Sequence, residues 1–101
     1  VFQQEITVMD NQVHICLSGS IYEEEMLPLR KELTGCIAKG HKDFVLDFGN
    51  VDYIDSGGLG ELVAFQKWAL QANGHIIIKN LKGLVKDVFE AMRLTKVFDI
   101  K

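Results

Sequence analysis

One short segment combines a hydroxyl group with a cluster of glycines: Asp55-Ser56-Gly57-Gly58-Leu59-Gly60. It follows a strand-like segment and precedes a helical one, so we expect it to form the start of a helix. The first backbone N–H groups of a helix have no internal partner and lie at the positive end of the helix dipole. Glycines leave such amides uncovered and allow another backbone to approach closely. The hydroxyl of Ser56 could therefore cap the helix or accept a phosphate.

A phosphate on Ser56 would add about −1.5 to −2 charges. The helix start would accept this charge with a stabilisation of about 0.3–1 kcal/mol, so the domain should stay folded when modified. A partner packed against that edge would instead meet a dianion without a counterion, and binding should weaken by several kcal/mol. The alternative is that Ser56 only caps the helix and the glycines only relieve crowding. The chemistry of the residues leaves both interpretations open.

Hydrolase chemistry is a weaker interpretation of the same segment. Ser56 could meet His75 in space, since triads assemble from distant residues, but it lacks the Gly-x-Ser-x-Gly elbow. The glycines lack the Lys-Ser/Thr ending of a phosphate-binding loop. Neither the histidines nor the cysteines, Cys16 and Cys36, have metal-ligand spacing. We expect no enzyme activity, no cofactor and no metal, and two reduced, mostly buried thiols.

Strands and helices alternate around this segment. Apolar periodicity predicts strands over 2–9, 13–18, 44–48 and 76–78, with a further strand-like stretch at 51–54. Helical stripes predict helices from about 25 to 40, from about 57 to 72, and over 84–92, followed by a short packed tail at 97–100. The first helix should begin near Glu25 because Pro28 is tolerated only in a first turn, and it should end at Gly40. Gly19 should end the second strand.

Strands that are joined through helices must run parallel, with right-handed crossovers. We therefore predict an α/β fold: a small mixed β-sheet with an antiparallel edge from the opening hairpin and helices packed mainly on one face. The second helix has more apolar side chains than one stripe needs. We expect Phe65 and Trp68 both to complete the core, the alternative being that one of them is partly exposed as a contact patch.

Length and charge exclude several classes of function. The chain has 101 residues, which fits one domain over 1–101, and its net charge is −3. We expect no nucleic-acid partner, because no basic stripe stands out. We expect no membrane insertion, because the apolar runs are far shorter than the roughly 20 residues of a spanning helix. Without a secretory signal the expected location is cytoplasmic, and without an initiator Met the chain can belong to a longer protein.

The stretch from Ile54 to Gly60 resembles the signature of STAS domains, in particular the bacterial anti-sigma factor antagonists. The resemblance continues through 13–21, 43–54, 76–81 and 88–100, and so covers nearly all of the chain. It implies that Ser56 is phosphorylated by a cognate serine kinase that is also an anti-sigma factor. It further implies that the unphosphorylated chain binds this kinase and frees a sigma factor, and that a phosphatase reverses the modification. We expect a monomer or weak dimer.

The resemblance places the partner-binding surface on the 20–25 loop and the start of the second helix. The residues concerned are Ser20, Tyr22, Glu23, Asp55, Ser56, Gly57, Gly58 and Leu59.

Two positions depart from the pattern of the family. Relatives commonly have an acid directly after the Gly-x-Ile/Leu step, close to the serine, whereas this chain has Tyr22 there and Glu23 next. A small loop shift would let Glu23 substitute. Position 57 is Gly, where relatives often have Ser, Thr or Ala. Two other functions stay open: an unmodified STAS scaffold or accessory subunit of a signalling complex or transporter, and a module that binds a small molecule or lipid.

Overall fold

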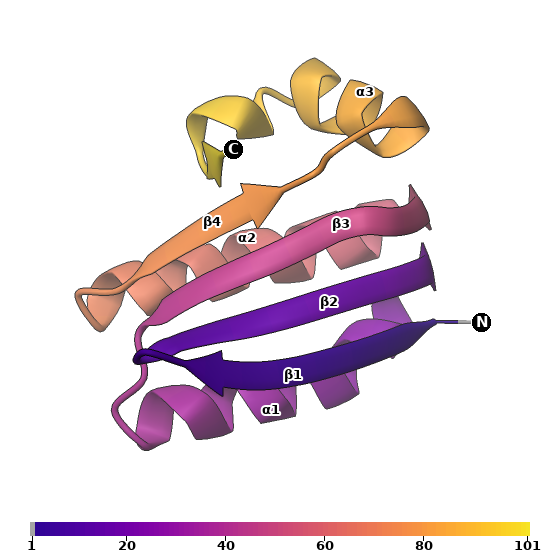
Figure 1. Cartoon of the computed structure of the whole chain (residues 1–101). Coiled ribbons are helices and arrows are strands. Elements are labelled where there is room, and N and C mark those ends of the chain that lie inside the picture. The colour runs from indigo at the N-terminus through magenta and orange to yellow at the C-terminus, as the bar shows by residue number, and fades with distance from the viewer. Residues whose placement is uncertain (1) are drawn as a thin grey trace.

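The sheet of this protein is mixed, and its strands lie in the order in which they occur along the chain, β1-β2-β3-β4-β5 (Figure 1). The computed structural model describes residues 2–101. Strand β1 pairs antiparallel with β2, and every other neighbouring pair is parallel. The elements are β1 (Gln3–Met9), β2 (Gln12–Ile21), α1 (Glu23–Ala38), β3 (Asp43–Ile54), α2 (Ser56–Gln71), β4 (His75–Lys79), α3 (Gly83–Ala91), the 3-10 turn η1 (Leu94–Lys96) and β5 (Asp99–Ile100).

The helices cover one face of this sheet, as predicted. Figure 1 shows α1 and α2 side by side behind the strands. Alternate side chains of β3, among them Phe44 and Phe48, are buried on this side. The ring of Phe44 lies 4.9 Å from that of Phe65 in α2, and the ring of Phe48 lies 5.7 Å from that of Phe89 in α3. The core therefore lies between the sheet and its helices.

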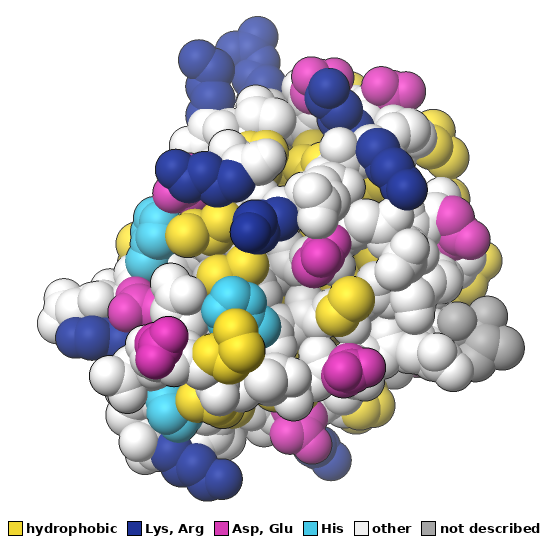
Figure 2. All heavy atoms as spheres, viewed as in Figure 1, with side chains coloured by type: hydrophobic (Ala, Val, Ile, Leu, Met, Phe, Trp, Pro, Cys, Tyr) yellow, Lys and Arg dark blue, Asp and Glu magenta, His cyan; other side chains and the backbone are white. Residues whose placement is uncertain are grey.

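Within the described part of the chain, the opposite face of the sheet carries no helix (Figure 1). Figure 2 views this open face, where charged and histidine side chains are spread among apolar ones. Cys16 is exposed here, which corrects the prediction that both thiols are mostly buried. It lies on the face of β2 opposite to Ile15 and Leu17, and no helix among residues 2–101 covers that face (Figure 1). Cys36 is half-buried in α1, and burial raises the pKa of its thiol.

Two strands extend well beyond their predicted C-terminal ends, toward the segment that contains Ser56. Strand β2 continues through Gly19 to Ile21, because Gly19 adopts a φ of 90° and the pairing with β3 shifts register on both sides of it. Such bulges absorb a residue without ending a strand. Strand β3 runs without interruption through the Gly49-Asn50 pair to Ile54. These two extensions bring the ends of β2 and β3 together at Ile21 and Ile54.

The first helix also differs from its prediction, because it begins at Glu23 rather than near Glu25. Pro28 is therefore its sixth residue, beyond the first turn. The missing N–H of Pro28 would have paired with the carbonyl of Glu24, an exposed residue at the helix start where water can replace the bond. The end of the helix is as predicted, since Gly40 follows it with a φ of 95° and donates its N–H to the carbonyl of Ile37.

The C-terminal part of the chain is less deeply packed than its apolar pattern predicted. In α3, Val85 and Phe89 are buried, but Leu84 is 58% exposed, and Met92, which follows the helix, is 61% exposed. The expected packed tail contains a two-residue strand, β5, that pairs parallel with β4.

In α2, Phe65 is buried whereas Trp68 is 40% exposed, so the prediction that both complete the core holds only for Phe65. No helix among residues 2–101 combines the length and apolar character needed to cross a membrane.

Candidate functional site

The candidate site lies where β2 and β3 end and α1 and α2 begin. Ile21 pairs with Ile54, and the backbone N–H of Asp55 donates to the carbonyl of Ile21 at 3.0 Å. Each strand then passes into its helix within two residues, so the first turns of α1 and α2 start next to each other. The structure thus brings together the predicted site residues of both segments.

Asp55 holds the starts of both helices. Its extended backbone makes it the N-cap of α2, and its Oδ1 accepts the N–H of Gly58 at 2.7 Å. Its other oxygen, Oδ2, accepts the N–H of Glu23, the first residue of α1, at 3.3 Å. Helix α1 has no side-chain cap of its own from Tyr22. One carboxylate therefore satisfies backbone donors of two helices that would otherwise lack partners.

Ser56 is the first residue of α2, not its cap, and it is exposed. The interpretation that its hydroxyl only caps the helix is therefore wrong, because Asp55 already fills that role. Among residues 2–101, no hydrogen bond engages the Ser56 hydroxyl. The hydroxyl is thus open to solvent at the positive end of the α2 dipole, and a phosphoryl group attached there would project away from the core.

The residues after Ser56 form the inner wall of the site. Gly58 and Leu59 are buried. A Cβ atom at position 58 would lie 3.1 Å from the side chain of Ile54 and 3.2 Å from that of Ile21. Glycine thus allows α2 to start directly against the two strand ends, and Leu59 anchors this turn in the core.

Glu23 lies against Gly57. A Cβ atom at position 57 would lie 2.6 Å from the Cβ of Glu23 and 2.7 Å from its Oε1. The φ of Gly57 is not positive, so its backbone does not require glycine. Its missing side chain instead leaves the room that Glu23 occupies. Glu23 therefore lies beside the residue that follows Ser56.

The edge of the site contains two residues that the sequence analysis missed, Asp52 and Tyr53. The hydroxyl of Ser20 donates to Oδ1 of Asp52 at 2.9 Å. The rings of Tyr22 and Tyr53 are exposed and lie 5.6 Å apart. These pairs depend on the shifted register between β2 and β3, which opposes Ser20 to Tyr53. The alternating pattern of either strand alone carries no signal for it.

The charge of the site is negative. Acidic residues surround the serine in sequence and in space, and neither the 20–25 segment nor the 52–60 segment contains Lys or Arg. A phosphate on Ser56 would have no cation from these segments to pair with. Its charge would therefore face whatever molecule approaches this surface.

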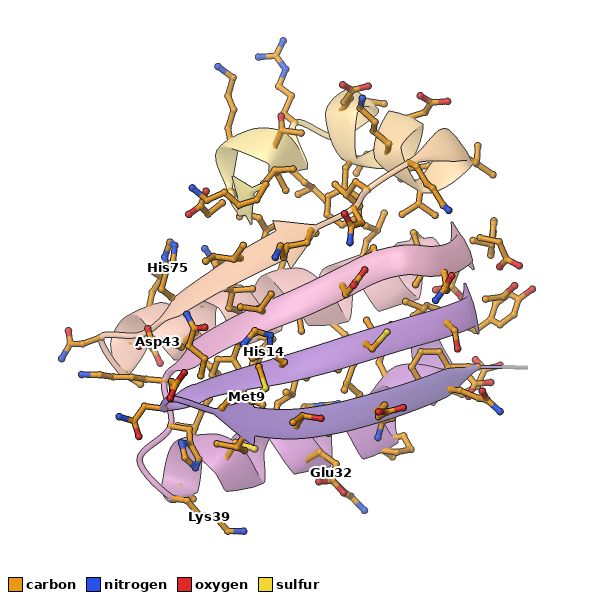
Figure 3. All side chains as sticks on the ribbon, in the orientation of Figure 1. Met9, His14, Glu32, Lys39, Asp43 and His75 are labelled. Carbon is orange, nitrogen blue, oxygen red and sulfur yellow. The ribbon has the colours of Figure 1, made fainter. Side chains whose placement is uncertain are left out.

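Position rules out the pairing of Ser56 with His75. His75 is opposite Asp43 at the start of β3, whereas Ser56 follows the end of that strand. Figure 3 shows His75 and Asp43 together at the edge of the sheet where β3 begins. The length of β3 separates the two side chains, on the order of 30 Å at ~3.3 Å per residue. The Nε2 of His75 instead lies 2.8 Å from Oδ2 of Asp99.

The apolar hollow between α1 and α2 is too small for a lipid. It has a volume of about 30 Å³ and is lined by residues that include Met26, Leu33, Phe65 and Trp68. Sites for small molecules usually measure about 300–1,000 Å³. A wider apolar hollow of about 370 Å³ adjoins it, lined by Thr34, Ile37, Trp68, Gln71 and Ala72, but it lies open at the surface. Neither hollow is the deep apolar pocket that would favour a module that binds a small molecule or lipid.

Comparison with known proteins agrees with this geometry. A family model described as "Mlab, STAS domain" matches residues 6–99. BtrV of Bordetella bronchiseptica, whose name assigns it to the anti-sigma factor antagonists, is 32% identical over 92 residues, which cover 91% of this chain and 79% of BtrV.

Solved structures agree in fold. The Thermotoga maritima protein TM1081 superposes with a TM-score of 0.88 at 20% identity, covering 96% of this chain and 84% of TM1081. The Bacillus protein SpoIIAA in its phosphorylated form superposes with a TM-score of 0.77 at 22% identity, covering 100% of this chain and 91% of SpoIIAA. The protein described here therefore belongs to the STAS domain family, among relatives that are named anti-sigma factor antagonists.

Proposed function

We propose that this protein is a partner-switching module of the anti-sigma factor antagonist type, controlled by reversible phosphorylation of Ser56. The observation that carries the proposal is the position of Ser56 as the exposed first residue of α2, with the capping role taken by Asp55. The hydroxyl is free to react, and no structural bond is lost when it does. A relative with the same fold, SpoIIAA, has been solved in a phosphorylated form.

The proposed partners are a serine kinase that is also an anti-sigma factor and a phosphatase that reverses the modification. The proposed contact surface comprises Ser20, Tyr22, Glu23, Asp55, Ser56, Gly57, Gly58 and Leu59. Exposed Tyr22 and Tyr53 lie together beside these residues, and tyrosine is enriched at protein interfaces relative to the rest of the surface. We place this module, extending over 1–101 and without enzyme activity of its own, in the cytoplasm, where sigma factors act.

The switch follows from the charge of the surface. Unmodified Ser56 is a small neutral group that a partner can cover. A phosphate there adds about −1.5 to −2 charges beside acidic side chains. A covered dianion without a cationic partner destabilises a complex by several kcal/mol, which is enough for release. The modification would thus end the binding without unfolding the domain.

Intact-mass spectrometry tests whether Ser56 is the acceptor. The wild-type chain, Ser56→Ala and the control Ser20→Ala are each incubated with the cognate kinase and ATP. We expect one phosphate on the wild type and on Ser20→Ala, and none on Ser56→Ala. Equal uptake by Ser56→Ala and the wild type would exclude Ser56 as the acceptor.

Co-purification separates this proposal from an unmodified scaffold or transporter subunit. A switching protein should retain a kinase with Ser56→Ala and lose it with Ser56→Asp. A scaffold or accessory subunit should retain the same partners with both variants. Retention of transporter components by both would therefore contradict the proposed function.

A further inference from the structure

The pair formed by Glu23 and Gly57 connects Ser56 to the first turn of α1. The three nearest atoms to a Cβ at position 57 all belong to Glu23, at 2.6–2.9 Å. Real side-chain contacts are not this short, so a side chain at position 57 and the present position of Glu23 exclude each other. Glu23 is also the residue whose N–H is held by Asp55. Its carboxylate therefore lies over the start of α2, directly beside the residue that follows Ser56.

Two negative groups would compete for this place once Ser56 is modified. The positive end of the α2 dipole favours negative charge near the first turn, where the unmodified chain already places the carboxylates of Asp55 and Glu23. A phosphate on Ser56 brings about −1.5 to −2 charges to the same turn. Like charges at the start of the same helix repel each other, and the side chain of Glu23 is exposed and can rotate away from Gly57.

We propose that Glu23 is an internal sensor of the charge on Ser56: its side chain packs on Gly57 while the serine is free, and leaves that place when the serine carries a phosphate. This inference rests on the proposed function for its biological meaning. Its consequence is that phosphorylation changes the partner surface in two places, at Ser56 and at the first turn of α1. Gly57 makes this coupling possible, because any larger residue would expel Glu23 beforehand.

NMR on the full chain tests the proposal without a kinase. Phosphoserine is incorporated at position 56 during translation, and nuclear Overhauser contacts are measured between the side-chain protons of Glu23 and the Hα protons of Gly57. We expect the contacts in the unmodified chain and their loss in the phosphoserine chain. The same measurement on Glu23→Gln, which has the same shape without the charge, should show contacts that persist in the phosphoserine form.

Each other outcome overturns the inference. Contacts that persist in the phosphoserine form of the wild type would show that Glu23 does not respond to the phosphate. Loss of the contacts in both the wild type and Glu23→Gln would show that bulk, not charge, displaces residue 23. Absence of the contacts from the unmodified wild type would show that Glu23 does not pack on Gly57 before modification. None of these results depends on whether a kinase modifies Ser56, so this inference and the proposed function fail separately.

Discussion

At the scale of single residues, the adjacent residues Asp55 and Ser56 have different roles in the site. Asp55 makes the structural hydrogen bonds, to Gly58 at 2.7 Å and to Glu23 at 3.3 Å. Ser56 makes none with the residues described and is exposed. A residue that can be modified at no structural cost is what a reversible switch requires. The stability of the domain should therefore depend strongly on Asp55 and very little on Ser56.

Replacement of Asp55 by Ala should destabilise the domain by about 1–2 kcal/mol, because backbone donors of both helices lose their acceptor. Ser56→Ala should change the free energy of unfolding by less than about 0.5 kcal/mol, as an exposed substitution without a lost bond. Urea denaturation followed by circular dichroism measures both. Equal destabilisation by the two variants would mean that Ser56 also supports the helix start.

The residue types of the motif predicted a helix start with a modifiable hydroxyl, but not which side chain caps it. Asp and Ser are almost equally good caps, so composition alone could not choose between Asp55 and Ser56. The exposure of Cys16 could not be predicted from the sequence either. Alternation places it opposite to Ile15 and Leu17, but whether a second layer covers that face depends on the path of the whole chain.

At the scale of elements, β5 depends on a polar contact as well as on strand pairing. This strand has only two residues, and Asp99 within it lies 2.8 Å from Nε2 of His75 and 3.5 Å from Nζ of Lys101. The hydrogen bond from His75 is the main cause that holds the pKa of Asp99 below its ordinary value. Ionised Asp99 therefore helps to fasten β5 to the start of β4.

The sign of this pKa shift fixes its pH dependence. Because the pKa of Asp99 is lower in the folded chain, its stabilising contribution is complete above the ordinary pKa of Asp and is lost as the pH falls through the lowered value. His75→Ala should raise the pKa of Asp99 toward its ordinary value, as measured by a carbon-13 NMR titration of the carboxyl group. The control His14→Ala removes a histidine whose ring contacts Gln12 instead. Equal pKa values in His75→Ala and the wild type would contradict the assignment.

The helices and strands could be predicted where the apolar pattern is long. The prediction of their bounds failed where pairing with a neighbouring strand overrides the local pattern. The order of strands and helices, the mixed sheet and the end of α1 just before Gly40 follow from periodicity and capping. The continuation of β2 through Gly19 does not, because a bulge with a φ of 90° is stabilised by the neighbouring strand. Strand β5 is too short to show a period of its own.

At the scale of the whole molecule, aromatic rings join the C-terminal elements to the sheet. Phe89 of α3 is fully buried, 5.7 Å from the ring of Phe48 and 6.1 Å from that of Phe98. These contacts hold α3 and the segment leading to β5 against β3. The proposed partner surface lies at the opposite end of β3 from the Asp43–His75 pairing (Figure 1).

Phe89→Ala should cost about 3–5 kcal/mol of unfolding free energy, since it leaves a cavity where three rings meet. This is a large part of the roughly 5–15 kcal/mol that holds a typical domain together. Met92→Ala is the matched control: its side chain is 61% exposed and belongs to the same predicted stripe, so the change should stay within about 0.5 kcal/mol. Chemical denaturation of both variants checks the difference. A similar loss in both would mean that this end of the core is packed differently.

The most direct test of the account is the affinity of the partner that co-purifies with Ser56→Ala, measured by calorimetry against two forms of the chain. One form is unmodified, and the other contains phosphoserine at position 56. We predict binding at least about 100-fold weaker to the phosphoserine form, or about 2.7 kcal/mol, with the free energy of unfolding of that form changed by less than about 1 kcal/mol. Equal affinity for the two forms would contradict the claim that a charge on Ser56 controls binding.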